Sequence, residues 1–142
     1  MRVIQLEKII MMINEMEILI RFRAMRTKEI IDEIYEQESF KNFIFLDNFK
    51  FYVDEEKDNV VDSWRRAVEK TMFLNEMDKL ILINIGEQIG STDIEGQLSM
   101  LNINKGKIQH NLNEAEESLA VKGKMLKTVW PLIGIVISLV II

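Results

Sequence analysis

The stretch that decides the fold is Gly-Glu-Gln-Ile-Gly-Ser-Thr-Asp-Ile-Glu-Gly-Gln, residues 86–97. Gly86 and Gly90 place two positions without a side chain on one helix face, which lets a second helix approach closely. Gly90 also marks the end of that helix, because glycine tolerates the left-handed geometry of a C-terminus. Asp93 supplies negative charge where the next helix exposes unpaired N–H groups. The block predicts a tight corner between two helices, with a structural role for Gly86, Gly90, Asp93, Gly96 and Gln97.

Downstream of the corner the sequence predicts the longest helix. Thr92, followed three residues later by Glu95, is a capping box that opens it. Residues then recur at three-and-four spacing in a heptad-like seam that two lysines interrupt, and such a seam packs on a partner helix. The seam consists of Leu98, Leu101, Lys105, Ile108, Leu112, Ala115, Leu119, Lys122 and Leu126.

Upstream of the corner, Asn75 precedes Glu76 and Asp78, which is a polar cap with acids in the first helical turn. A helix is expected from there to about Gly90. The N-terminal residues 3–23 form another helix, whose narrow apolar seam contains Leu6, Ile9, Ile13, Met16 and Ile20. This seam is the natural partner of the long C-terminal one, although the two seams could equally meet across a dimer.

Three shorter helices are expected between residues 27 and 71, with Thr27, Ser39 and Asp58 as their N-terminal caps and an acidic loop at 53–59. Their predicted buried residues are Ile30, Ile31 and Ile34 in the first, Phe40, Phe43, Ile44, Leu46 and Phe49 in the second, and Val61, Trp64, Ala67 and Val68 in the third.

The composition agrees with an all-α antiparallel bundle of five or six helices. The chain has 142 residues, 48% of them hydrophobic, with only six glycines and one proline, few for a protein of short strands and tight turns. It has no cysteine, which excludes disulfides and cysteine-built metal sites. A net charge of −5 argues against nucleic acid as a partner.

The C-terminus has a different character from the body. No acidic residue follows Glu117, and residues 129–142 are uncharged. Fourteen helical residues rise about 21 Å, against about 30 Å of hydrocarbon, but neighbouring residues lengthen the run, and lysines at the membrane boundary can extend their ammonium groups toward the headgroups. Those lysines are Lys122, Lys124 and Lys127. We therefore expect a cytoplasmic bundle over 1–127 and a C-terminal transmembrane anchor over 128–142; the alternative is a buried terminal core helix.

No pattern in the sequence indicates catalysis. His110 lies beside the seam without a nucleophile-and-base motif, so it is interpreted as a surface imidazole. The glycines do not form a phosphate-binding loop, and the acidic runs 54–58 and 114–117 are typical of solvated faces. We expect no catalytic, cofactor-binding or metal-binding residues.

The basic residues Arg21, Arg23, Arg26 and Lys28 are the one basic concentration in the body. They fit a bend that faces solvent. They also fit a docking surface for an acidic partner or for anionic lipid.

The order of several features is characteristic: Leu80 to Gly86, then Gly90, Asp93, Gly96 and Gln97, then a long polar helix, a lysine-flanked segment and a terminal apolar helix. In this order the sequence resembles the stage III sporulation protein AB family. Residues 17–20 with Thr27, and Trp64 with Ala67, also fall where the family has corresponding signatures. Family members usually begin with an apolar membrane helix, whereas this chain opens on the amphipathic segment at Val3.

The resemblance implies a membrane-anchored, non-enzymatic helical bundle of endospore-forming bacteria, similar to the F-type platform proteins of type II secretion. It implies a place in the mother-cell to forespore channel, at the cell membrane with the bulk of the chain on the mother-cell side. The expected partners are a secretion-type ATPase, stage III sporulation protein AA, the other channel subunits and further copies of the chain. The alternative is a tail-anchored helical adaptor for another cytosolic partner.

Overall fold

The computed structural model describes residues 1–23, 26–56, 59–90 and 93–141, with side chains as far as Val121. These ranges contain helices and no strand, which confirms the all-α prediction. The elements are α1 (Arg2–Arg23), α2 (Thr27–Tyr35), the 3₁₀ helix η1 (Glu38–Phe40), α3 (Ile44–Asp54), α4 (Val60–Lys70), α5 (Glu76–Gln88) and α6 (Ile94–Ile141).

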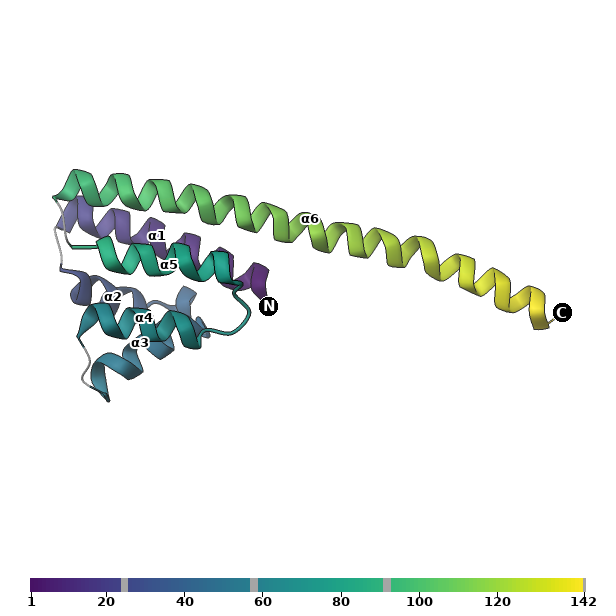
Figure 1. Cartoon of the computed structure of the whole chain (residues 1–142), viewed down its shortest axis with the longest axis horizontal. Coiled ribbons are helices and arrows are strands. Elements are labelled where there is room, and N and C mark those ends of the chain that lie inside the picture. Colours follow the sequence, from purple (N-terminus) through teal and green to yellow (C-terminus); the bar gives the residue numbers. More distant parts are fainter. Residues whose placement is uncertain (24–25, 57–58, 91–92, 142) are drawn as a thin grey trace.

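The first helix and the last helix form an antiparallel pair that runs the length of the bundle (Figure 1). Lys105 on α6 donates hydrogen bonds of 3.1 Å to Asn14 and Glu17 on α1. The predicted N-terminal seam is buried, as are Leu98, Leu101, Ile108, Leu112 and Ala115 of the C-terminal seam. The two seams therefore meet within one chain.

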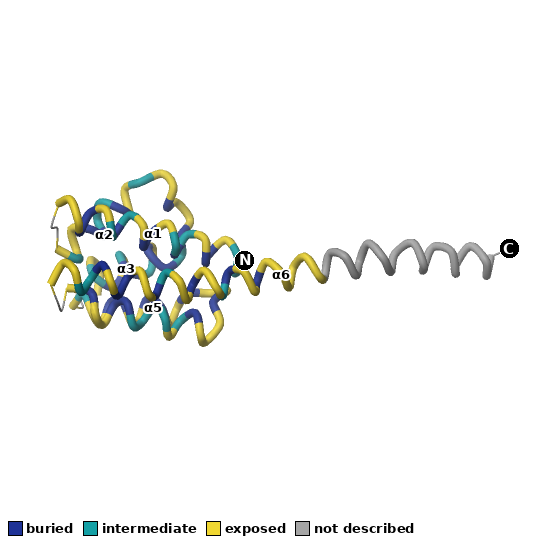
Figure 2. Tube along the Cα trace, turned by 90° about the horizontal axis from the view of Figure 1, so that it is seen from above, coloured by how far each residue is buried: buried dark blue, intermediate teal, exposed yellow. Residues whose placement is uncertain are grey.

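The remaining helices are added one after another to this pair. Helix α5 packs on α6, α4 packs on α5, and α3 packs on α4, while α2 folds back from the end of α1. Figure 2 shows the buried residues turned inward on each helix and α6 leading away from the bundle past the N-terminus. Among the residues whose side chains are described, those of α6 that are buried in the bundle lie between Leu98 and Ala115.

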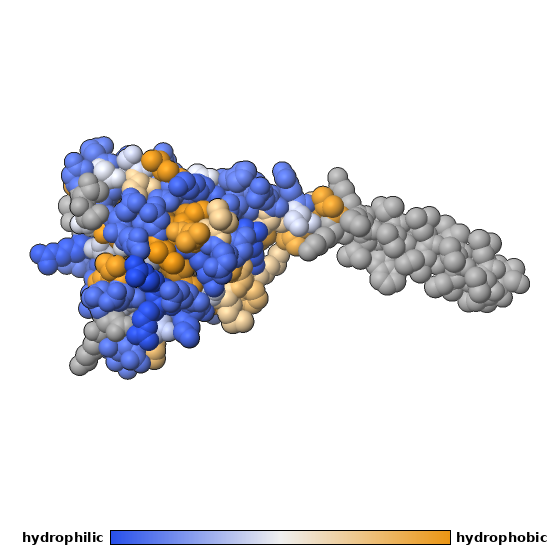
Figure 3. Space-filling model, viewed as in Figure 1, coloured by the Kyte–Doolittle hydropathy of each residue, from blue (hydrophilic) through white to orange (hydrophobic). Residues whose placement is uncertain are grey.

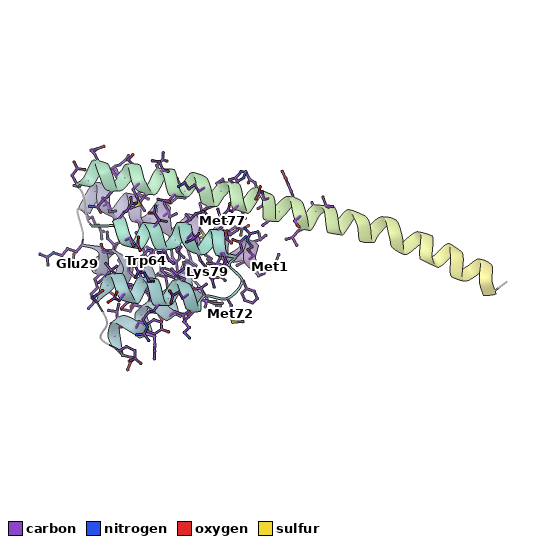
Figure 4. All side chains as sticks on the ribbon, viewed as in Figure 1. Met1, Glu29, Trp64, Met72, Met77 and Lys79 are labelled. Carbon is purple, nitrogen blue, oxygen red and sulfur yellow. The ribbon has the colours of Figure 1, made fainter. Side chains whose placement is uncertain are left out.

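An aromatic cluster joins α3, α4 and α5. The ring of Trp64 meets Phe45 edge-on at a centroid distance of 4.8 Å and Phe49 at 5.9 Å, arrangements that favour aromatic pairs. The Trp64 indole donates a 2.7 Å hydrogen bond to the Leu82 carbonyl of α5. Trp64, which Figure 4 shows between α4 and α5, therefore ties the two helices together.

Gly86 is the position that admits this tryptophan. A Cβ atom at residue 86 would lie 2.2 Å from Cδ1 of Trp64, far inside van der Waals contact. Gly90 has φ +78, and a Cβ there would lie 3.2 Å from the Thr27 hydroxyl. The corner after α5 thus uses one glycine for a close approach and the other for a left-handed backbone.

Two predicted helix starts are wrong. Helix α3 begins at Ile44 and not after Ser39, because Phe40 and Phe43 both turn into the core and Asn42 adopts a left-handed φ of 65 between them. Thr27 is the first residue of α2 and not its cap; the Glu29 carboxylate instead accepts from the Arg26 backbone N–H at 3.4 Å.

Two buried positions are also corrected. Val61, expected in the core, is 43% exposed, and Phe45 is buried where Ile44 had been expected. The later start of α3 changes which residues point inward.

Two of the predicted caps, Asp58 and Thr92, lie outside the described residues. Asn59 accepts from the Asp62 N–H at 2.8 Å and caps α4. Asp93 accepts from the Gly96 N–H at 2.7 Å at the start of α6. Asn75 caps α5 as the sequence predicted, through a 2.9 Å bond from the Asp78 N–H.

Where side chains are described, no helix has a stretch long and apolar enough to cross a membrane. The predicted anchor 128–142 and the boundary residues Lys122, Lys124 and Lys127 lie outside that part of the chain.

Replacing Gly86 by alanine is expected to lower the free energy of unfolding by about 2–3 kcal/mol, because the new methyl group forces Trp64 out of its pocket. The matched control is Gly106→Ala on α6, where a Cβ meets nothing within 4 Å. That control should stabilise the protein by about 0.5–1 kcal/mol through helix propensity. Urea unfolding of the full chain followed by circular dichroism measures both; equal effects would contradict the assigned role of Gly86.

Candidate functional site

An open groove of about 720 Å³ lies between α5 and α6. Helix α5 contributes Met77, Leu80, Ile81 and Asn84 to its walls, and α6 contributes Ile103, Asn104, Gly106, Lys107, His110 and Asn111. Met77 lies on the side of α5 toward α6 (Figure 4). Figure 3 shows apolar side chains gathered over the middle of the face that carries α5, bordered by hydrophilic ones.

The groove exposes large apolar side chains. Met77 is 62% exposed, Leu80 60% and Ile103 57%, although helices of a bundle usually turn such residues inward. Gly106 leaves the α6 wall open, since nothing lies within 4 Å of the position its Cβ would take. Contiguous exposed apolar surface with a polar border is typical of a protein-binding site.

The polar residues of the groove do not form a catalytic arrangement. Its lining contains no carboxylate and no hydroxyl, and its one imidazole, His110, is solvent-exposed and lies 3.2 Å from Glu114. Lys107 has no ion-pair partner among the described residues. Within those same residues no group of three or more carboxylates or imidazoles is placed to hold a metal ion. The groove therefore has the character of a binding surface.

A buried ionic clamp fixes the end of the groove. The Asp78 carboxylate is fully buried and accepts from Arg2 at 2.8 and 3.0 Å and from the Asn111 amide at 2.8 Å. It also accepts from the Asn75 backbone N–H at 3.1 Å. One side chain thus joins α1, α5 and α6, and its hydrogen bond raises the pKa of Arg2 above the ordinary value.

The sequence predicts Asp78 in the first turn of a helix that Asn75 caps, but it does not indicate the partners of this carboxylate. Arg2 and Asn111 lie 76 and 33 residues away along the chain, so no local pattern connects them. The groove has no signal in the sequence, because only the structure shows that Leu80 is exposed, away from the buried face that Leu82 and Ile85 define.

The structure brings the predicted corner residues together at the start of α6. Asp93 accepts from the backbone N–H groups of Gly96 and Gln97, at 2.7 Å through its side chain and 2.9 Å through its carbonyl. Gly86 and Gly90 precede them at the end of α5.

The basic residues lie at the turn from α1 to α2, at the end of the bundle away from the C-terminus (Figure 1). Arg21, Arg26 and Lys28 are exposed, while Arg23 donates to Glu33 at 2.8 Å. All four side chains are thus exposed to solvent, and the docking surface predicted here stays a prediction.

Replacing Arg2 by alanine is expected to cost about 2–3 kcal/mol of folding free energy, because the Asp78 charge stays buried with half of its hydrogen bonds lost. Arg23→Ala breaks the exposed pair with Glu33 and should cost less than about 1 kcal/mol. Urea unfolding at neutral pH measures the difference. A loss from Arg2→Ala no greater than that of the control would show that the clamp is not stabilising.

The comparisons with known proteins agree with this architecture. The sequence profile of the family described as stage III sporulation protein AB matches residues 1–142. A solved structure titled "Stage III sporulation protein AB (SpoIIIAB)" superposes with a TM-score of 0.69, covers 83% of this chain and 95% of that chain, and is 17% identical; at this identity the likeness establishes the fold alone. No curated protein sequence matches the chain directly. Because the family profile spans the full sequence, the chain belongs to the stage III sporulation protein AB family.

Proposed function

We propose that the protein is a non-enzymatic, membrane-anchored assembly subunit of the mother-cell to forespore channel that endospore formation requires. The observation that carries the proposal is the length of α6, which spans Ile94–Ile141, while the α6 residues that the structure shows buried in the bundle lie between Leu98 and Ala115. Membership of a stage III sporulation family supplies the cellular process. A helix that is part of both the bundle and the anchor would hold the bundle in a fixed orientation relative to the membrane.

The composition of the C-terminal part supports the anchor. Residues 129–142 carry no charge, and Lys122, Lys124 and Lys127 precede them without any acidic residue after Glu117. Lysines on one side of an apolar run favour the cytoplasmic side for the chain that precedes it. The body would therefore face the mother-cell cytoplasm.

The bundle offers two surfaces to other subunits. The groove between α5 and α6 is apolar and exposed, and the basic turn Arg21 to Lys28 lies at the end away from the C-terminus (Figure 1). With the C-terminus in the membrane, the stretch of α6 from Ile94 to Lys122 would separate that turn from the lipid by about 40 Å. This distance favours a protein partner over a lipid surface. A secretion-type ATPase, stage III sporulation protein AA, and the other channel subunits are the proposed partners.

Charged residues in the apolar tail test the anchor. The double change Ile135→Asp and Val136→Asp is expected to move the full chain from the membrane to the soluble fraction, because two carboxylates cost several kcal/mol inside the bilayer. Flotation of cell lysate on a density gradient measures the distribution. The control is Ile103→Asp with Leu80→Asp in the bundle, which should float like the parent; release of both variants, or of neither, would count against the anchor.

Sporulation tests the role itself. Deleting the gene in its spore-forming host should abolish heat-resistant spores and leave vegetative growth normal. Among complementing variants, Leu80→Glu should lower the spore count at least tenfold by charging the groove, whereas Val61→Glu, at a comparably exposed apolar residue of α4, should complement fully. A vegetative growth defect on deletion would favour the adaptor function instead.

A further inference from the structure

The loop between α4 and α5 exposes two consecutive large apolar side chains. Met72 is 63% exposed and Phe73 is 52% exposed, whereas their neighbours Thr71 and Leu74 are 2% and 8% exposed. Burying such side chains would stabilise the fold, and the buried neighbours show that the core is within reach of this loop. We call Met72 and Phe73 the apolar tip.

The residues on either side hold the apolar tip in place. The Thr71 hydroxyl donates a 2.7 Å hydrogen bond to the Ala67 carbonyl of α4, and Asn75 caps α5. Between them Phe73 has a φ of 73, a left-handed backbone that a bulky residue rarely adopts because its side chain crowds the main chain. The loop thus keeps a phenyl ring outside the core at a conformational cost, which is typical of functional positions.

The apolar tip lies at the end of the bundle from which α6 continues toward the C-terminus (Figure 1). Helix α5 begins just after the tip, and Asp78 in its first turn is bonded to Asn111 of α6 and to Arg2 at the start of α1. Figure 4 shows Met72 and Met1 at this same end. The tip therefore belongs to the side of the bundle that would face the membrane.

Little of α6 separates this end of the bundle from the apolar tail. Among the residues whose side chains are described, the last one of α6 that is buried is Ala115, and the lysines that precede the tail begin at Lys122. These seven residues of helix rise about 10 Å. With the tail in the bilayer, the apolar tip would lie close to the lipid headgroups.

The charges near the tip do not favour a strongly charged partner. Lys70 and Glu69 precede the tip, and Glu76 and Lys79 follow it, so the charges of the loop balance. The acidic run 114–117 on α6 would repel an anionic surface. Attraction of the tip to a membrane must therefore come from its apolar side chains, which the boundary between headgroups and acyl chains accepts.

We propose that Met72 and Phe73 insert into the interfacial region of the lipid bilayer beside the C-terminal anchor. The inference rests on the anchor of the proposed function and adds a second point of contact to it. A helical anchor alone allows the bundle to rotate about the helix axis. The tip removes this freedom and so determines which face of the bundle, including the groove between α5 and α6, is presented to other subunits.

A fluorescent probe tests the contact, since the chain has no cysteine of its own. Met72→Cys in the full-length chain is labelled with the fluorophore NBD and reconstituted at high dilution in neutral phosphatidylcholine vesicles, with or without bromine on the acyl chains. Bromine quenches a probe that reaches the lipid, so emission should fall about twofold. The control is Val61→Cys, a 43% exposed residue at the opposite end of α4, which should not be quenched.

A change at Phe73 separates membrane contact from folding. Phe73→Asn, added to the Met72→Cys chain, removes the ring, while asparagine tolerates the left-handed backbone. Quenching should then fall by about half or more, and the urea midpoint of the chain should stay the same or rise. A lower midpoint with unchanged quenching would show that Phe73 serves the fold alone and would overturn the proposal.

Flotation of the same vesicles distinguishes this inference from the anchor on which it rests. If the Met72→Cys chain floats but its probe is quenched no more than the one at Val61→Cys, the proposal is overturned while the anchor stands. A chain that does not float overturns both. A blue-shifted emission without bromine quenching would show that protein, such as a second copy, covers the tip, and would also overturn the proposal.

Discussion

Packing of α1 against the first part of α6 is the interaction on which the rest of the molecule depends. It joins the two ends of the body, buries both heptad-like seams and leaves α2 to α5 to be added on one side. Lys105 of α6 joins the two helices near the middle of the pair, through Asn14 and Glu17 of α1. At the N-terminal end of α1, Arg2 is linked to α6 through Asp78 of α5, which also bonds to Asn111. The apolar seam supplies the stabilisation, while the polar contacts set the register of the two helices.

The register has a direct consequence for the groove. Asp78 is held by Arg2 from α1 and Asn111 from α6, so α5 is placed relative to both long helices by one buried carboxylate. Farther along α5, Gly86 admits Trp64 and draws α4 against the helix from the opposite side. Within the residues whose side chains the structure describes, the face of α5 that carries Leu80 has no packing partner, and Leu80 is 60% exposed because the other two faces contact α4 and α6.

Much of this fold could be predicted from the sequence, because its signals are local. Seven-residue periodicity identified both long helices, and Asn75 identified the start of α5. The start of α3 was placed wrongly because tertiary packing decides it: Phe40 and Phe43 are buried on either side of Asn42, whose backbone is left-handed. The clamp of Arg2, Asp78 and Asn111 could not be predicted either, because its residues come from three helices that are far apart in the sequence. The groove could not be predicted because apolar helix residues are usually buried in a bundle, and only the structure shows that Leu80 and Ile103 are exposed.

Helix α6 is continuous from the bundle toward the proposed anchor, and Gly123 is the residue at which its helix propensity is lowest before Pro131. Spin labels at cysteines replacing Lys107 and Lys127, twenty residues apart, test this directly in the full chain reconstituted in lipid vesicles. An unbroken helix predicts one narrow distance distribution centred near 30 Å. A broad distribution, or one centred well below that distance, would show that the helix bends or breaks between bundle and tail and would contradict the account.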